Sequence, residues 1–261
     1  MWPNKPSKWT LVPPNRWTVV PSCAEHAAQV GHRRLPPAGK FDFERTLLDL
    51  IGGRRFRFGE VGIDGLYGPT ETVVIADENV SENHAATAVE SLESCGYRIL
   101  LHVVAEGESS KNLDTVRQLY DHLLAARIER RSPVISVAGG VIGDTVGFAA
   151  ATFLRGVPLV LCPTTLLAMV DASVGGKVGV NLPQGKNLVG AFYQPTLVVA
   201  DINTLFTLTQ RDLRCGLAEC VKHGMVRDPG LFDWLECHLE SVLARDSQTL
   251  TELVHRNVQI K

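Results

Sequence analysis

The chain has 261 residues, of which 45% are hydrophobic, 21% charged and 7% aromatic. This is the composition of an ordinary globular protein, and it excludes a fibrous chain, a coiled coil or a wholly disordered chain. The formal net charge of −2 gives no overall positive field, so we predict no nucleic-acid partner. The sequence contains no run of about 18 apolar residues and no secretory signal, so we expect a cytoplasmic protein without a membrane partner.

The first part of the chain differs in composition from the rest. Half of the 14 prolines and three of the four tryptophans lie before residue 40. Residues 1–60 carry ten Lys and Arg against five Asp and Glu, a local excess of positive charge. Dense proline leaves little room for regular structure. We therefore predict that residues 1–70 form an atypical, basic and partly disordered leader, with a basic contact arm as the alternative.

From residue 71 the hydrophobic pattern becomes regular. Short apolar runs alternate with amphipathic stretches, of which residues 111–127 form the clearest helix. Strands that alternate with helices imply βαβ units and a mostly parallel sheet. An α/β domain is therefore predicted. Its expected buried strands are residues 72–76, 98–104, 134–138, 159–162 and 197–200.

After Asp201 the strand pattern stops, and residues 209–226, 230–239 and 247–261 are predicted to be helices. In the first of these, apolar side chains recur every four residues. The chain ends inside the last helix without a C-cap glycine. We therefore expect residues 206–261 to be the start of an all-α domain that is truncated. The apolar positions at four-residue spacing are Leu213, Leu217, Val221 and Met225.

A glycine turn follows the predicted strand 134–138. Gly139 and Gly140 would let backbone N–H groups approach a pyrophosphate, at the start of a helix that we predict from Asp144. Thr164 and Thr165 follow another strand, where hydroxyl groups would face the crevice in which sheet ligands bind. A tight strand-to-helix turn and a simple helix N-cap are the respective alternatives.

Two further motifs carry charged side chains. Lys177 and Lys186 lie in two glycine-rich turns near Asp171, where two ammonium groups on flexible backbone suit a phosphorylated anion. Two solvated loop lysines are the alternative. Further on, Glu219 and His223 share one side of a helix with Lys222. That helix face is either a solvated surface, or it carries a metal ligand together with the residues next to it.

Taken together, these strings resemble the 3-dehydroquinate synthases, a family of sugar-phosphate cyclases in the shikimate pathway. The resemblance runs from about residue 73 to residue 261. It rests on nine short strings in a fixed order. They are DENV from Asp77, GESSK ending at Lys111, GGVIGD ending at Asp144, FLRG from Phe153, PTTL ending at Leu166, VDASVGGK ending at Lys177, GKN ending at Asn187, FYQP ending at Pro195 and GLAE ending at Glu219.

The resemblance implies a Rossmann-like NAD-binding domain over residues 71–205 and a helical metal- and substrate-binding domain from residue 206. It implies bound NAD, a divalent metal (zinc or cobalt) and the substrate 3-deoxy-D-arabino-heptulosonate 7-phosphate. The family oxidises C5 transiently, eliminates phosphate, reduces C5 again and closes a carbocycle, which yields 3-dehydroquinate. A homodimer is compatible with this reading.

The resemblance also assigns residue roles. Glu219 would be the first metal ligand. The residues that meet the substrate, some of them catalytic, would be Arg155, Asp171, Lys177, Asn187 and Lys222. The residues of the NAD site would be Asp77, Asn79, Glu108, Lys111, Gly139, Gly140, Val141, Gly143, Asp144, Thr164, Thr165, Lys177, Lys186, Thr204 and Thr207.

The sequence departs from the family pattern in three places. Ala138 stands where the family has the first glycine of a triple-glycine run, and His223 stands where tyrosine is common. The family takes two further metal ligands, both histidines, from a region beyond Lys261. We therefore expect the given chain to hold one of three metal ligands and not to turn over its substrate at a useful rate.

Three other readings remain beside a dehydroquinate synthase. One is a catalytically inactive NAD-binding fragment of that family. Another is a sister cyclase that makes inosose or valiolone-type rings, although the SVGGK string ending at Lys177 and the FYQP string ending at Pro195 favour dehydroquinate synthase. A metal-dependent polyol dehydrogenase is disfavoured, because the phosphate cluster from Asp171 to Asn187 would have no purpose.

Overall fold

The computed structural model describes residues 71–94 and 97–261, so the predicted leader over residues 1–70 lies outside the described residues. Five parallel strands form the central sheet, with the spatial order β2-β1-β3-β4-β7. The alternation of strands and helices thus gives the predicted α/β architecture. The strands are β1 (Glu71–Asp77), β2 (Arg98–Val104), β3 (Val134–Ala138), β4 (Leu159–Pro163) and β7 (Leu197–Val198).

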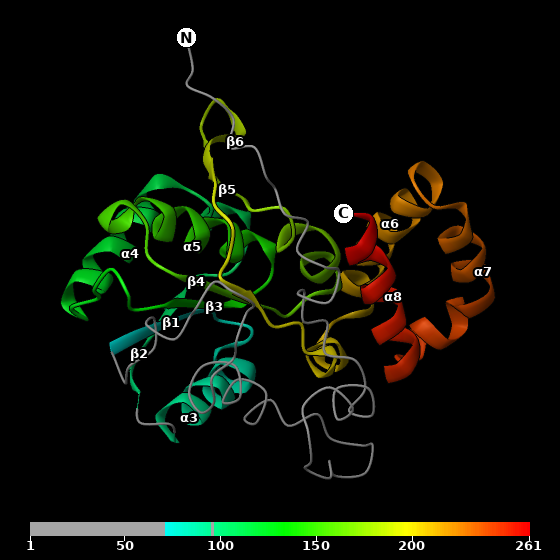
Figure 1. Cartoon of the computed structure of the whole chain (residues 1–261), viewed down its shortest axis with the longest axis horizontal. Helices are drawn as coiled ribbons and strands as arrows, with labels where there is room; N and C mark the ends of the chain where they lie inside the picture. The colour runs from blue at the N-terminus through cyan, green and yellow to red at the C-terminus, as the bar shows by residue number, and fades with distance from the viewer. Residues whose placement is uncertain (1–70, 95–96) are drawn as a thin grey trace, which may run out of the picture.

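Helices cover both faces of this sheet (Figure 1). On one face lie α4 (Leu113–Ala125) and α5 (Gly140–Thr152), and on the other lies α3 (Ala86–Ser94). The inner strands are buried on both sides, because successive side chains of β1 alternate between two hydrophobic clusters. The first cluster contains Val73 and Ile75 and the second contains Val74 and Ala76.

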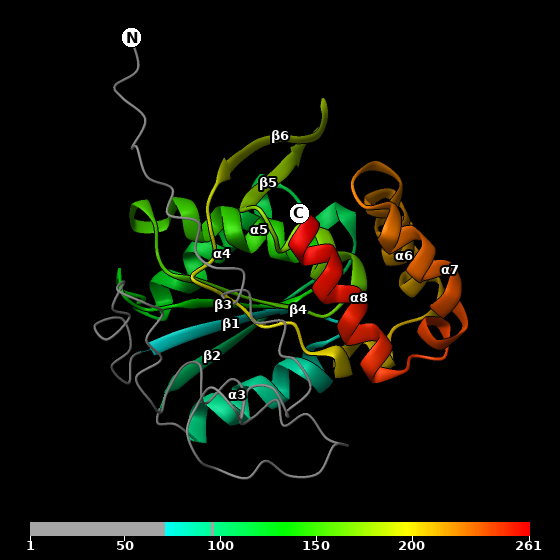
Figure 2. The same ribbon diagram turned by 45° about the vertical axis from the view of Figure 1, so that its right-hand side comes forward.

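A β-hairpin projects from this layered domain beside α5 (Figure 2). It consists of β5 (Lys177–Leu182) and β6 (Gly185–Phe192), which pair in antiparallel fashion. Of the two glycine turns predicted around Lys177 and Lys186, one lies directly before β5, where Gly175 and Gly176 have positive φ angles, whereas the two lysines themselves lie on the strands. Gly179 and Gly190 belong to the ladder itself, and a Cβ at Gly179 would lie 2.6 Å from the carbonyl oxygen of Val189. Glycine is needed because the two backbones approach so closely.

Three helices follow the sheet, as predicted: α6 (Gln210–Val226), α7 (Pro229–Leu243) and α8 (Ser247–Ile260). They stand together beside the sheet (Figure 1). Their hydrophobic cluster also includes Leu166 and Met169, which follow β4, and Leu205, which follows β7. The helices therefore pack against the carboxyl-terminal ends of these two strands.

The buried stripe of α6 differs from the predicted one. Leu213 and Leu217 are buried, but Val221 is partly exposed and Met225 is 72% exposed. An α-helix has 3.6 residues per turn, so a stripe at four-residue spacing rotates steadily around the helix. The buried positions after Leu217 are instead Cys220, His223 and Gly224.

Candidate functional site

The strand order changes direction inside the sheet, between β1 and β3. From β1 the chain passes to β2 on one side, while β3 and β4 continue on the other side. In open α/β sheets, ligands bind outside the carboxyl ends of the strands at such a point. Here those ends are Asp77 of β1 and Ala138 of β3. The site is therefore sought around the turns that follow these two residues.

The turn after β3 begins α5 earlier than predicted. The helix starts at Gly140, not at Asp144, and Gly139 is its N-cap residue without a side-chain cap. The first N–H groups of the helix thus lack a side-chain acceptor, which suits an anion. A Cβ at Gly140 would lie 2.9 Å from that of Ala172, so glycine allows the close approach. Ala138 is a buried residue of β3 paired with Pro163, so its methyl group fits the strand.

Because α5 starts early, Asp144 lies one turn inside it and meets Lys111. The Lys111 ammonium Nζ lies 2.5 Å from Asp144 Oδ2, and the Lys111 side chain is only 7% exposed. Burial raises the pKa of Asp144, while the Lys111 ammonium opposes this by lowering it. Two residues of the predicted NAD set are therefore joined as a largely buried ion pair.

A second polar group joins the hairpin to the short turn η3 (Glu108–Ser110). Asn181 Nδ2 donates to Glu108 Oε1 at 2.8 Å, and Lys186 Nζ lies 3.3 Å from the same oxygen. The hydrogen bond from Asn181 lowers the pKa of Glu108, and Lys186 adds to this effect. Asn181 Oδ1 also accepts from the backbone N–H of Asn187. Glu108, Lys186 and Asn187 are thus held together.

Thr164 and Thr165 follow β4 and differ in their hydrogen bonding. Thr165 Oγ1 accepts from Ala168 N at 3.1 Å, which is the simple helix-capping role considered above. Thr164 Oγ1 is buried and has no hydrogen-bond partner within the described residues. A buried hydroxyl without a partner is costly, so this group is available to a ligand.

The outer part of the predicted NAD set is already hydrogen-bonded within the chain. Asp77 Oδ1 accepts from Asn79 N at 3.0 Å, and burial raises the pKa of Asp77. Thr207 Oγ1 donates to Thr204 O and lies 2.9 Å from His84 Nε2. The Thr204 hydroxyl donates to a backbone carbonyl, so it serves the turn in which it lies.

A cleft of about 480 Å³ lies between α5, the hairpin and the end of α8. Its charged and amide side chains are Asp144, Asp171, Lys177, Asn187 and Lys261. Three members of the predicted substrate set are thus brought together, next to Asp144 of the cofactor set. Lys261 was missed by sequence reasoning, because its ion pair with Asp171 joins residues 90 positions apart.

Two other residues of the predicted substrate set do not line this cleft. Arg155 is exposed in the turn η4 (Phe153–Arg155), where Leu154 and Arg155 have φ angles of 49° and 68°. These left-handed conformations are uncommon for residues other than glycine. Lys222 is 58% exposed and pairs with Glu219, which raises the pKa of Lys222.

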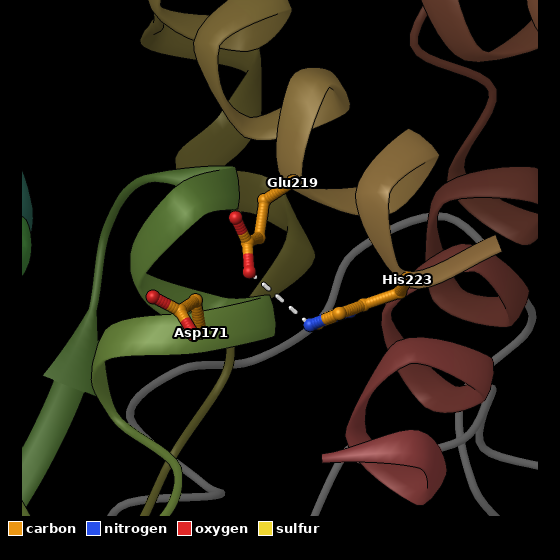
Figure 3. Close-up of side chains that lie close together, drawn as sticks. All are labelled: Asp171, Glu219 and His223. Atoms are coloured by element: carbon orange, nitrogen blue, oxygen red, sulfur yellow. Dashed lines mark ion pairs between the residues drawn. The ribbon is translucent and has the colours of Figure 1, made fainter. Parts of the chain in front are cut away.

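Glu219 belongs to a separate cluster of possible metal ligands. It lies one helical turn from His223 on α6, and both face Asp171 of the π-helical turn η5 (Ala168–Ala172) (Figure 3). One potential ligand atom from each residue lies within 4.8 Å of the others. Of the two readings left open for this helix face, a fully solvated surface does not fit, because Glu219 and His223 are largely buried; Lys222 Nζ and His223 Nε2 both contact Glu219 Oε1.

The fold and the site together define a class: α/β proteins with an uncapped helix N-terminus at the carboxyl end of the sheet, a cleft lined by charged side chains and a group of possible metal ligands. The sequence model described as 3-dehydroquinate synthase N-terminal matches residues 101–215, and the model of the C-terminal part matches residues 216–261. Together they span well over half of the chain. The chain therefore belongs to the 3-dehydroquinate synthase family.

Individual relatives agree with this membership. A 3-dehydroquinate synthase from Nitrosospira multiformis is 55% identical over 159 residues, which are 61% of this chain and 43% of that protein. The chain spans about half the length of the curated relatives it matches.

Among solved structures, a 2-epi-5-epi-valiolone synthase from Streptomyces hygroscopicus, with NAD⁺ and Zn²⁺ bound, is 34% identical with a TM-score of 0.70. The match covers 74% of this chain and 54% of that one. A 2-deoxy-scyllo-inosose synthase, complexed with carbaglucose-6-phosphate, NAD⁺ and Co²⁺, is 30% identical with a TM-score of 0.69. This match covers 74% of this chain and 52% of that one. A glycerol dehydrogenase from Schizosaccharomyces pombe is 20% identical and shares the fold alone.

Among residues 71–94 and 97–261, no helix has the length and apolar character that crossing a membrane requires.

Proposed function

We propose that this chain carries the NAD- and substrate-binding part of a 3-dehydroquinate synthase. The reaction would convert 3-deoxy-D-arabino-heptulosonate 7-phosphate to 3-dehydroquinate and phosphate, with NAD and a divalent metal, zinc or cobalt. The observation that carries the proposal is the meeting of Asp144, from the cofactor set, with Asp171, Lys177 and Asn187 in one cleft. A cofactor and a sugar phosphate must lie side by side for hydride transfer.

The uncapped N-terminus of α5 supports NAD binding. Its free N–H groups would hold the pyrophosphate, and Gly139 and Gly140 leave room for its close approach. The orphaned Thr164 hydroxyl would gain a partner from the same cofactor. Asp77, at the end of β1, would hold the adenosine side. Both solved cyclases hold NAD⁺, which supports this assignment.

The cleft suits a phosphorylated substrate. Lys177 and Lys261 would hold the phosphate and stabilise the negative charge that it carries away on elimination. Asn187, held through its backbone by Asn181, would orient a hydroxyl group of the sugar. Asp171 lies between the cleft and the metal ligands, so it would hold a sugar hydroxyl close to both.

Glu219 with the neighbouring Asp171 and His223 suits a divalent metal, because carboxylate and imidazole groups are ligands that zinc and cobalt accept. A metal held there would polarise the C5 hydroxyl that is oxidised. Lys222 Nζ contacts Glu219 Oε1 in this structure, so this contact would give way to a bound cation.

Calorimetric titration of the NAD-loaded chain tests the proposal. We expect 3-deoxy-D-arabino-heptulosonate 7-phosphate to bind more tightly than carbaglucose-6-phosphate, the ligand of the inosose synthase structure. Lys177→Met would weaken binding of both by about 10- to 100-fold, because a charge-assisted contact to phosphate is lost. The control is Arg98→Met, because Arg98 is an exposed cation that pairs with Glu71 at the start of β2 and does not line the cleft. Failure of the folded chain to bind either phosphate would contradict the proposal.

A sister cyclase is the second candidate, because both solved structures above are such cyclases. Tighter binding of carbaglucose-6-phosphate in the same titration would favour it. The higher identity to proteins named 3-dehydroquinate synthase, 45–55% against 30–34%, supports the first candidate.

A further inference from the structure

Ser136 stands in the middle of β3 among apolar side chains. Its register partners on the two neighbouring strands are Ile75 of β1 and Leu161 of β4, and both belong to the hydrophobic cluster on the side of α4 and α5. Ser136 is only 2% exposed, and its Oγ has no hydrogen-bond partner among the described residues. A buried hydroxyl without a partner is costly, so a serine at this position requires an explanation.

A small pocket provides that explanation. It has a volume of about 20 Å³, lies between β3, β4 and the start of α5, and is lined by Ser136. Glycines of the α5 turn line it as well, and they carry no side chain that could fill it. They are Gly139, Gly140 and Gly143. A buried water needs about 10–15 Å³ of such space, so the pocket has room for one.

The wall of the pocket offers further hydrogen-bonding groups beside Ser136. One is the carboxylate of Asp144, in which Lys111 contacts Oδ2 and Oδ1 is the second acceptor. Burial raises the pKa of Asp144, so a donor in the pocket would stabilise its ionised form. Another is the Ser173 hydroxyl, which donates to Ala168 O at 2.7 Å and keeps lone pairs that can accept. A buried water makes about two to four hydrogen bonds, and these groups provide partners for them.

Ser136 differs from the other buried hydroxyl groups that have no partner in the described part of the chain. Thr72, in β1, is fully buried but lines neither this pocket nor the cleft. Thr164 follows β4 and does not line the pocket either. Of these three residues, Ser136 alone combines an unpartnered hydroxyl with a space of the size of a water molecule.

We propose that Ser136 Oγ holds one ordered water in this pocket, beside the first turn of α5. The pocket shares Asp144 and Lys177 with the cleft, so the water extends hydrogen bonding from the interior of the sheet to the charged wall of the cleft. Water fits because it is small, neutral and able both to donate and to accept. The inference goes beyond the proposed function, because it requires neither NAD nor a sugar phosphate.

High-resolution crystallography of the 261-residue chain without added ligand tests the inference directly. We expect density for one water at about 2.5–3.0 Å from Ser136 Oγ, the usual distance between two hydrogen-bonded oxygen atoms. A pocket without this density, or a Ser136 hydroxyl that donates to a protein atom instead, would overturn the inference. The experiment uses the unmodified chain, so it is decisive even where a variant fails to fold.

The direction of a change in melting temperature tests the same inference in solution. Ser136→Ala removes a hydroxyl that is bonded to water. The melting temperature should therefore stay level or fall by up to about 4 °C. Thr72→Val is the matched control, because Thr72 is also a buried hydroxyl of the sheet without a protein partner, but away from the pocket.

Thr72→Val removes an unpartnered hydroxyl from a dry position while keeping the shape of the side chain. We expect it to raise the melting temperature by about 2–6 °C. A similar rise in Ser136→Ala would show that the Ser136 hydroxyl is dry as well, and this result would overturn the inference. A rise in Thr72→Val with none in Ser136→Ala is the result that supports it.

Discussion

The turn at the start of α5 and the cluster on α6 would bind ligands by different means. The first offers backbone N–H groups and the space left by Gly139 and Gly140, all from one short stretch of chain. The second combines side chains from η5 and α6, one of them positioned by α8. A backbone site is built by local sequence, whereas a side-chain site depends on how distant elements pack. Substitutions should therefore disturb the first site locally and the second through packing.

The largest expected effect is on the ion pair beside the α5 turn. Asp144→Ala leaves the buried Lys111 ammonium without its carboxylate, and we expect the free energy of unfolding to fall by about 3–5 kcal/mol. Replacing both residues, as Lys111→Met with Asp144→Ala, should recover most of this loss. Urea unfolding of the wild type and these two variants measures it, and equal losses in the single and double variants would show that the pair does not matter.

Asp201, where the sheet gives way to the helices, should make stability depend on pH. Burial raises its pKa to about 6, from an ordinary value of 3.8. Because the folded state holds the proton more tightly than the unfolded state, the stability that protonation contributes is complete below about pH 4 and is lost as the pH rises through about 6. A shift of about two units corresponds to about 3 kcal/mol at most.

Asp201→Asn removes this pH dependence of stability. The amide oxygen can still accept the hydrogen bond from Asn203 N, which Asp201 Oδ1 accepts at 2.9 Å in the wild type. We expect the variant to gain about 2–3 kcal/mol over the wild type near pH 7 and almost nothing near pH 4. Chemical unfolding at the two pH values is the measurement. An equal gain at both would mean that Asp201 is not the titrating group.

A smaller effect is expected where α6 meets η5. A Cβ at Gly216 would lie 2.6 Å from that of Leu166 and 2.7 Å from the backbone nitrogen of Leu167. Gly216→Ala should therefore cost about 1–3 kcal/mol of stability through overpacking. It should also weaken Zn²⁺ binding, since the helix that carries Glu219 must move from Asp171. Gly143→Ala is the control, because nothing lies within 4 Å of the added methyl group.

The smallest expected effect is at the N-terminus of α6. Thr209 Oγ1 accepts from Asp212 N at 3.1 Å and so caps the helix. Thr209→Ala should lower the stability by about 1 kcal/mol and leave NAD binding unchanged, because the cap is far along the chain from the α5 turn. Thermal unfolding measures the first effect and calorimetry the second. Weaker NAD binding would show that the two regions are more closely coupled than described.

Much of the sheet could be predicted from sequence because its strands are short, apolar and separated by helices. Residues 98–104 and 134–138 match β2 and β3. The hairpin was missed, because Gly179 and Gly190 interrupt the strand pattern for a reason that lies in the facing strand. Local patterns report local structure, and the close pairing of two backbones is not local.

The same distinction holds for the sites. Gly139, Gly140 and Asp144 were predicted from one motif to hold NAD, which stays a prediction, and the structure corrects where the helix begins. His223 was noted beside Glu219, but its burial and its bond to Asn257 depend on the packing of α8 against α6. The hydrogen bond between His223 and Asn257 could not be predicted from the sequence, because 34 residues separate the two side chains.

The most direct test of the central claim, that the α5 turn forms an NAD site distinct from the metal ligands of α6, is a calorimetric titration of NAD into three versions of the 261-residue chain. We predict one NAD per wild-type chain, binding weakened about 10- to 100-fold by Asp144→Asn, and binding within about twofold of the wild type for Glu219→Gln. Absence of NAD binding to the folded wild-type chain, or unchanged affinity in Asp144→Asn, would contradict the account.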